Sequence, residues 1–246
     1  VGTMSGTGTT TIASGGTLSL SGATKTLART LVNEGTTNWT GGALVLNNTT
    51  FQNNGNFTAS TSGTLDSNVA SGNNVFNNVG TFTKLGAGTV QFSGNTYPFN
   101  NSGLVDVQQG MLGLLSGGSH TGLFTGATGT TLSLSGTHTF APGADISGGM
   151  DVSLGSGNVT LNSNLSTTGT VTVLGGGTLN FQSGKIRAST FNRSGSFNMT
   201  GGRLAVDSIV GSIGVSGGVL SPGDVGAAGI THIQGIYSQG PAGTLQ

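Results

Sequence analysis

Glycine-led strand openings recur along this chain and restrict its fold more than any other feature. In each opening, apolar residues stand at the second and fourth positions after a glycine. Three openings follow one another between Lys84 and Leu114: Gly88 with Val90 and Phe92, Gly103 with Val105 and Val107, and Gly110 with Leu112 and Leu114. Such period-two alternation predicts a strand with one buried face. We therefore expect an all-β fold.

The openings form two families of glycines that alternate along the chain. One family is Gly35, Gly55, Gly80, Gly103, Gly122, Gly149, Gly169 and Gly195, and the other is Gly42, Gly63, Gly88, Gly110, Gly129, Gly157, Gly177 and Gly202. Steps within a family run from roughly 19 to 28 residues, which fits one coil of a parallel β-solenoid. Leucine-rich, propeller and collagen patterns are absent from the sequence. The repeat predicts a parallel β-helix (β-solenoid) of about ten coils.

A second repeating pattern lies just before the glycines of the first family. Apolar residues stand four positions before six of its glycines: Leu31, Phe51, Phe76, Phe99, Leu165 and Phe191. Asparagine-rich triplets such as Gln52-Asn53-Asn54 come next. Equivalent residues of a solenoid stack about 4.8 Å apart. We expect the Phe positions to form an internal aromatic stack and the Asn positions to form a ladder of turns, since Asn tolerates left-handed backbone.

The repeat covers most of the chain, so residues 1–246 are predicted to form a single solenoid domain. Residues 1–38 are less regular, and residues 24–34 read as a short helical or looped excursion. Residues 39–219 carry the regular coils, and residues 220–246 read as an irregular terminal coil in which Pro222 ends a strand or lies in a turn. Both ends read as cut from a longer chain.

Composition narrows the function. Only 6% of the 246 residues are charged and the net charge is zero, so no basic stripe exists for nucleic acid. The chain has no cysteine, which excludes disulfides and thiolate metal sites, and no apolar run long enough to predict a membrane-spanning helix. A surface with so little charge associates easily, which favours self-association, end to end or lateral.

Residues 84–112 carry a specific resemblance. The run Lys84-Leu-Gly-Ala-Gly-Thr-Val-Gln-Phe-Ser-Gly-Asn-Thr-Tyr97, followed by Val105-Asp-Val107 and Gly110-Met-Leu112, resembles the autotransporter-associated β-strand repeat. Pro98-Phe-Asn-Asn101 departs from the usual Thr-Gly turn of that repeat. The resemblance implies a right-handed β-helix that is exported and displayed on the outer, extracellular side of a bacterial cell.

Because β-helices also carry polysaccharide lyases and glycosidases, the acidic residues need separate attention. Glycoside cleavage commonly uses two carboxylates about 5 to 10 Å apart. The acids are Glu34, Asp66, Asp106, Asp145, Asp151, Asp207 and Asp224, and no two share a frame at one-coil spacing. Asp145 and Asp151 are close in sequence but straddle a Gly-Gly turn. We expect solvated surface carboxylates.

The remaining candidate chemistry is equally sparse. His120, His138 and His232 share no spacing that would suggest a catalytic or metal site. The glycine-rich runs open strands, without the helix that a phosphate loop requires, and the Ca²⁺-binding nonapeptide is missing. No catalytic, cofactor or metal residue is therefore predicted.

The sequence thus favours a non-enzymatic extracellular protein with a structural or adhesive role, on the cell surface or in a surface filament. Its expected partners are further copies of itself and surface glycans or proteins. The alternative is a carbohydrate-active β-helix enzyme whose site lies on an unusual loop.

Overall fold

The computed structural model describes residues 2–94, 97–223 and 229–246, without the side chains of residues 65 and 68–71. Asn95, Thr96 and Asp224 lie outside the described residues. Within them the chain forms strands joined by turns and bends, and no helix is found. It follows that no helix in this part of the chain could cross a membrane.

Every strand pairing is parallel, and most strands pair with the third strand before and after them in sequence, which sorts the strands into three columns. We call these columns faces A, B and C. Face A contains β2 (Thr9–Ile12), β5 (Thr30–Asn33), β8 (Thr50–Asn53), β11 (Val75–Asn78), β14 (Phe99–Asn101), β17 (Gly118–His120), β24 (Gly177–Phe181) and β26 (Ser196–Met199).

Along the chain, each face B segment is followed by a corner and then by a face C segment. Face B contains β3 (Thr17–Leu20), β6 (Thr36–Trp39), β9 (Asn56–Ser60), β12 (Thr81–Leu85), β15 (Leu104–Val107), β18 (Leu123–Gly126), β20 (Ile146–Gly148) and β22 (Leu165–Thr167). Face C contains β1 (Gly2–Met4), β4 (Lys25–Leu27), β7 (Leu44–Asn47), β10 (Thr64–Ser71), β13 (Thr89–Phe92), β16 (Met111–Leu114), β23 (Thr170–Val173) and β29 (His232–Gln234).

Longer strands turn a corner and belong to two faces. Those joining face C to face A are β19 (Thr131–Phe140) and β21 (Asp151–Leu161). Those joining face B to face C are β25 (Lys185–Arg193) and β27 (Arg203–Val210), and those joining face A to face B are β28 (Ile213–Leu220) and β30 (Tyr237–Leu245).

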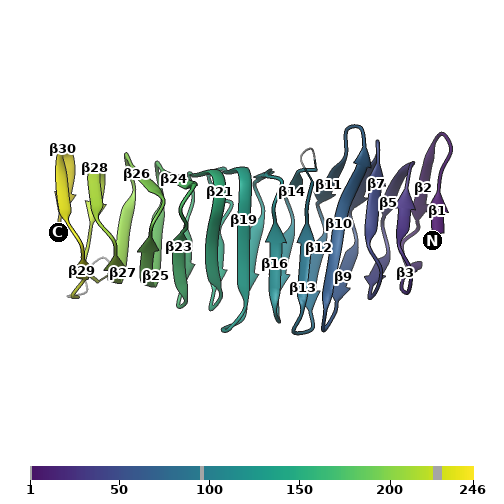
Figure 1. Cartoon of the computed structure of the whole chain (residues 1–246), viewed down its shortest axis with the longest axis horizontal. Coiled ribbons are helices and arrows are strands. Elements are labelled where there is room, and N and C mark those ends of the chain that lie inside the picture. The colour runs from purple at the N-terminus through teal and green to yellow at the C-terminus, as the bar shows by residue number, and fades with distance from the viewer. Residues whose placement is uncertain (1, 95–96, 224–228) are drawn as a thin grey trace.

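The coils stack along one axis into a rod, with the two ends of the chain at its opposite tips (Figure 1). The stack has about 11 turns, which confirms the predicted all-β parallel solenoid. Coil length varies more toward short values than expected. Phe57 pairs with Phe82, 25 residues later, whereas Leu204 pairs with Leu220, 16 residues later.

The core lies inside the three faces and follows the predicted alternation. Val90, Phe92, Val105 and Val107 are all fully buried. On face A, Phe51, Phe76 and Phe99 stack with ring centroids 4.9 and 5.0 Å apart, which confirms the aromatic stack. Leu165 and Phe191 do not extend this stack, because they lie on faces B and C.

The first glycine family marks the A-to-B corner only as far as Gly122. At that corner successive coils lie so close that a Cβ on Gly80 would overlap the carbonyl oxygen of Gly55, so only glycine fits. Gly149 and Gly169 instead precede face C, and Gly195 precedes face A. The same glycine motif therefore serves different corners in different coils.

The second family shifts in the same way. Its members from Gly42 to Gly129 precede face C, whereas Gly157 and Gly177 lie at the start of face A segments. The predicted excursion at residues 24–34 was also wrong. This segment contains β4 and β5, which pair in register with the following coil. Its basic residues do not interrupt the ladder, and Lys25 donates from Nζ to the Gly41 carbonyl at 2.8 Å.

Candidate functional site

A column of asparagines lies inside the solenoid on face A. Asn33, Asn53, Asn78 and Asn101 occupy the last inward position of four consecutive strands and are at most 1% exposed. The prediction of a ladder of turns at these positions was wrong. Strand alternation places Asn53 on the same side as Phe51, and the hydrogen bonds described next make that burial tolerable.

Each amide of this core ladder donates to the next coil. The Nδ2 to Oδ1 distances are 2.7 Å from Asn33 to Asn53, 2.7 Å from Asn53 to Asn78, and 2.8 Å from Asn78 to Asn101. The second N–H of each amide reaches a backbone carbonyl: Asn56, Thr81, Leu104 and Leu123 accept in turn at 2.9 to 3.1 Å. All four amides therefore have the same orientation, with Nδ2 toward the following coil. Among the side-chain atoms of this ladder, only Oδ1 of Asn33, at its first position, is buried without a partner in the described contacts.

Two histidines continue this column and lie together in the core. His120 pairs with Asn101 in the strand register, and its Nε2 lies 3.0 Å from Nδ1 of His138. The spacing in the sequence did not predict this contact, because His138 stands diagonally across from His120 on the next coil. His232, in contrast, is exposed on β29.

The hydrogen bonds fix the tautomer of this histidine pair. His138 Nε2 lies 3.1 Å from the Leu114 carbonyl and 3.0 Å from the Ser135 carbonyl, so it carries the proton. Its Nδ1 then accepts from His120 Nε2, and His120 Nδ1 is left without a partner in the described contacts. The rings of Phe124 and Phe140 surround His120, with centroids 5.0 and 4.5 Å away. Burial lowers the pKa of both histidines, and that of His120 well below its usual range.

We expect the histidine pair to make the protein sensitive to acid. Because the folded pKa lies below the unfolded value of about 6.5, its stabilising contribution is complete above that pH and is lost as pH falls below it. Each histidine would lower the free energy of unfolding by at most about 1.4 kcal/mol per pH unit. Urea unfolding from pH 7.5 to pH 4.5 measures this, and His120→Phe should flatten the profile. His232→Gln is the control and should keep the wild-type slope; an equally steep profile in His120→Phe would contradict the prediction.

Lys84 is a second ionisable group in the core. Its position on β12 faces inward, in register with Ala59 and Val107, and its side chain is fully buried. Nζ donates to the carbonyls of Leu85, Gly86 and Gln109 at 2.9, 2.6 and 2.9 Å. Burial lowers the pKa of Lys84 to about 8. The sequence signal for this lysine was strand alternation. Because Phe82 faces inward and Thr83 faces outward, Lys84 is expected to face inward.

We expect stability to rise with pH between about pH 8 and pH 10 because of Lys84. In that range the unfolded chain, with an ordinary lysine pKa near 10.5, binds a proton that the folded chain does not. The difference in unfolding free energy between wild type and Lys84→Met should therefore grow in favour of wild type as pH rises. Lys185→Met is the control, and a pH-independent difference between wild type and Lys84→Met would contradict the prediction.

The acidic residues that the structure describes lie on the outer surface, and several bind donors of the following coil. Glu34 accepts from Asn54 Nδ2 at 2.8 Å, Asp66 from Ser93 Oγ at 2.8 Å, and Asp151 from the Thr170 N–H at 2.7 Å. Asp145 accepts from the Asn164 N–H at 3.2 Å. Asp106 lies outward, as predicted, and accepts from Gln108 at 2.7 Å.

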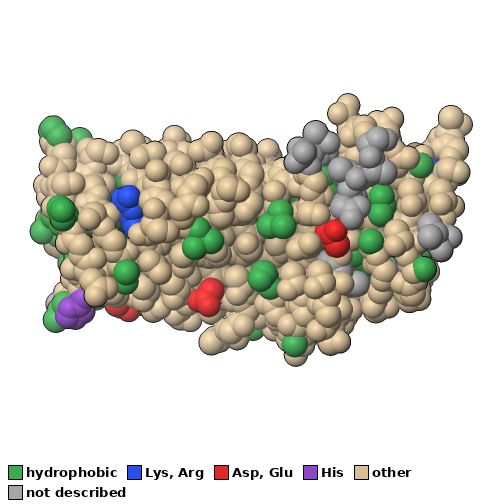
Figure 2. Space-filling view, viewed as in Figure 1, with side chains coloured by type: hydrophobic (Ala, Val, Ile, Leu, Met, Phe, Trp, Pro, Cys, Tyr) green, Lys and Arg blue, Asp and Glu red, His purple; other side chains and the backbone are tan. Residues whose placement is uncertain are grey.

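Asp207 lines a small surface hollow of about 100 Å³ with Arg187 and three hydroxyl residues, Thr167, Thr168 and Ser189. On the view of Figure 2 the charged side chains are scattered singly over a mostly uncharged surface. In the part of the chain that the structure describes, no three His, Asp or Glu residues are grouped so that they could hold a metal ion.

A second row of amides faces outward, just before the A-to-B corner of successive coils. Asn77 donates to Gln52 Oε1 at 3.1 Å, and Asn100 donates to Asn77 Oδ1 at 3.0 Å. The Ser119 N–H then donates to Asn100 Oδ1 at 3.0 Å. Beside this row runs an open hollow of about 310 Å³, which we call the amide groove. Its lining is Gln52, Asn77, Asn78, Val79, Asn100, Asn101, Ser102, Ser119 and Thr121.

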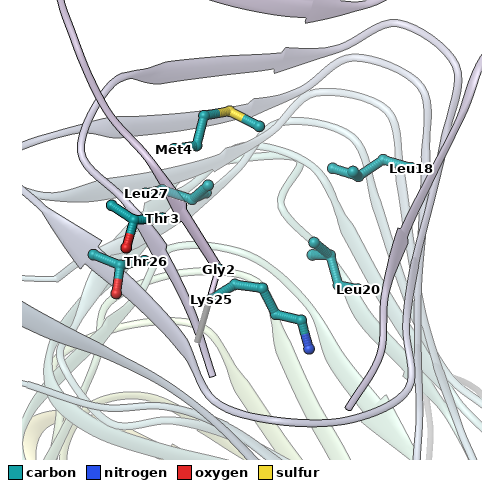
Figure 3. Close-up of a pocket in the computed structure, with 8 residues that line it drawn as sticks. All are labelled: Gly2, Thr3, Met4, Leu18, Leu20, Lys25, Thr26 and Leu27. Carbon is teal, nitrogen blue, oxygen red and sulfur yellow. The ribbon is translucent and has the colours of Figure 1, made fainter. Parts of the chain in front are cut away.

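Apolar residues also lie at the two ends of the rod. At the N-terminal end, Met4, Leu18, Leu20 and Leu27 border an open hollow of about 200 Å³, with Lys25 at its rim (Figure 3). At the other end, the exposed large apolar residues are Ile230, Ile236 and Leu245. These ends are the second candidate interaction surface.

Comparison with protein-family models, with curated proteins and with solved structures finds no match to this chain.

Proposed function

We propose that this chain is a non-enzymatic structural or adhesive β-solenoid displayed outside a bacterial cell, of the kind found in autotransporter passengers. It would stand on the surface or form part of a filament. The observation that carries the proposal is that surface carboxylates form hydrogen bonds between neighbouring coils. Glu34, Asp66, Asp145 and Asp151 each bind a donor on a neighbouring coil, so they strengthen the stack.

The solenoid itself supports an extracellular structural role. A parallel stack satisfies its backbone through the next coil and needs neither disulfide nor metal to close it. A long surface with few charges also suits display next to other copies. The resemblance of residues 84–112 to the autotransporter-associated repeat supports the placement outside the cell.

Incubation with a panel of neutral and acidic polysaccharides tests the non-enzymatic part. We expect no new reducing ends and no unsaturated products. Release of such products by wild type, and its loss in Asp145→Ala or Asp151→Ala, would establish the alternative of a carbohydrate-active enzyme. Asp106→Ala is the matched control, because its carboxylate is bound within its own coil.

For residues 1–246 by themselves, end-to-end association is the form of assembly that the exposed tips favour. Since all strands are parallel, the outer strands at one tip can pair with the opposite tip of a second copy in the same sense, covering the exposed apolar residues. Light scattering and electron microscopy at rising concentration should show rods in multiples of one length. A monomer that persists at millimolar concentration, or association that Ile236→Lys leaves unchanged, would count against this mode.

A further inference from the structure

We infer that the amide groove is a binding site for a neutral, extended oligosaccharide. The inference starts from the fixed geometry of its outer wall. Asn77 and Asn100 are each held by hydrogen bonds to the coils on both sides, so their amides are oriented before any ligand arrives. A preoriented polar group loses little conformational entropy on binding.

Each of these two amides, which line the groove, retains unused hydrogen-bonding capacity. An amide group has two N–H donors and an oxygen with two lone pairs. The row uses one N–H and one lone pair of Asn77. The same holds for Asn100, which donates to Asn77 and accepts from Ser119. A donor and an acceptor therefore remain on each amide, and sugar hydroxyls, which both donate and accept, match that combination.

Other residues of the lining supply the remaining contacts that a sugar needs. Val79 is 51% exposed there and offers methyl groups to the apolar face of a pyranose ring. Ser102 and Thr121, also exposed at this corner, add hydroxyls. The glycines that follow these corner residues keep the corner low, because they add no side chain beside it.

The lining also sets the charge of the ligand. None of the nine described residues that line the groove is ionisable. A phosphate, sulfate or uronate chain would have to give up hydration without gaining a cation, which is unfavourable. The groove therefore selects a neutral chain.

The direction of the groove favours a saccharide over a peptide. It crosses four coils, so it runs along the solenoid axis and perpendicular to the strands. The backbone groups of those strands are already paired with the coils on each side, which leaves none for strand addition. A linear saccharide instead meets one set of side chains per coil, about every 4.8 Å, a spacing similar to the advance of one pyranose unit.

This inference rests on the adhesive part of the proposed function, and binding tests it separately from cleavage. The 246-residue chain is titrated with cello-, xylo-, chito- and malto-hexaoses, and with a hexagalacturonate as the acidic probe. Calorimetry or saturation-transfer NMR gives the affinity. We expect at least one neutral hexamer to bind with millimolar or better affinity, and the acidic probe to bind at least tenfold more weakly.

Two variants assign binding to the groove. Val79→Arg and Ser102→Arg place a bulky cation in it, and each should weaken the neutral hexamer at least tenfold. Both positions are exposed, so folding should be kept, which a thermal melt checks. Leu174→Arg is the matched control, an exposed apolar residue at another corner, and should bind within twofold of wild type.

Three results would overturn the inference. They are the absence of binding to every neutral hexamer, a preference for the acidic probe, and full affinity in both groove variants. The last result would leave an adhesive role intact while placing the saccharide elsewhere. Cleavage of a hexamer would instead refute the proposed non-enzymatic function.

Discussion

Asn78→Leu is expected to destabilise this protein by about 4 kcal/mol, a large part of the 5 to 15 kcal/mol that holds a typical domain folded. The reason is the number of partners left behind. Asn53 keeps a buried N–H without an acceptor, and Asn101 keeps a buried side-chain oxygen without a donor. Each unsatisfied buried group costs about 1 to 3 kcal/mol, whereas leucine fills the space but forms no hydrogen bond.

Asn77→Leu is the matched control for this change. Asn77 is the preceding residue on the same strand, but it faces outward and its partner groups can bind water. Its loss should cost less than about 1 kcal/mol. Urea unfolding followed by circular dichroism measures both variants, and amide hydrogen exchange shows whether the loss is confined to neighbouring coils, as expected for a stack of repeats.

A double variant tests whether the ladder acts as a unit. In Asn53→Leu with Asn78→Leu, the N–H that was left unpaired by the second change is removed by the first. The two losses should therefore sum to more than the loss in the double variant, by about 1 kcal/mol or more. Strict additivity, or a cost of Asn78→Leu equal to that of Asn77→Leu, would show that the inward amides are not coupled.

The core ladder of asparagines shows which features of the fold could be predicted from the sequence and which could not. Alternation within a strand follows directly from backbone geometry, so the inward positions of Val90 and Phe92 were predictable. Alternation from Phe51 also places Asn53 inside, but the preference of asparagine for turns led to the opposite interpretation. The buried ladder exists because each amide finds a partner one coil away, and that pairing depends on a register between coils that varies from 16 to 25 residues.

The histidine pair was missed for a related reason. His120 and His138 are 18 residues apart, which is not a constant period of the chain, and they meet diagonally. A sequence pattern that assumes one coil length cannot bring them together. The outer amide row of Asn77 and Asn100 could have been found from the aligned Phe-Asn-Asn segments, because these keep their register on face A.

Phe92→Ala is expected to cost about 3 to 5 kcal/mol, since it removes the ring on which the aromatic core converges. Phe92 is fully buried on face C and meets rings from several other strands. Its ring centroid lies 4.8 Å from Phe99, 5.0 Å from Phe76, 5.6 Å from Phe82, 5.9 Å from Tyr97 and 6.4 Å from Trp39. Alanine would leave a cavity that these rings cannot fill without losing their own edge and stacking contacts.

Two comparisons separate this packing effect from a general effect of substitution. Phe92→Leu keeps most of the volume and should cost about 1.5 kcal/mol, while Leu123→Ala at an exposed position should change stability by less than about 0.5 kcal/mol. Equal costs for Phe92→Ala and Phe92→Leu would mean that the coils close over the missing ring. That collapse is resisted at the A-to-B corner, where Gly55 and Gly80 already lie too close for a Cβ. The glycine corners thus set the spacing of the coils, and within that fixed spacing the rings and the inward amides must fit one another.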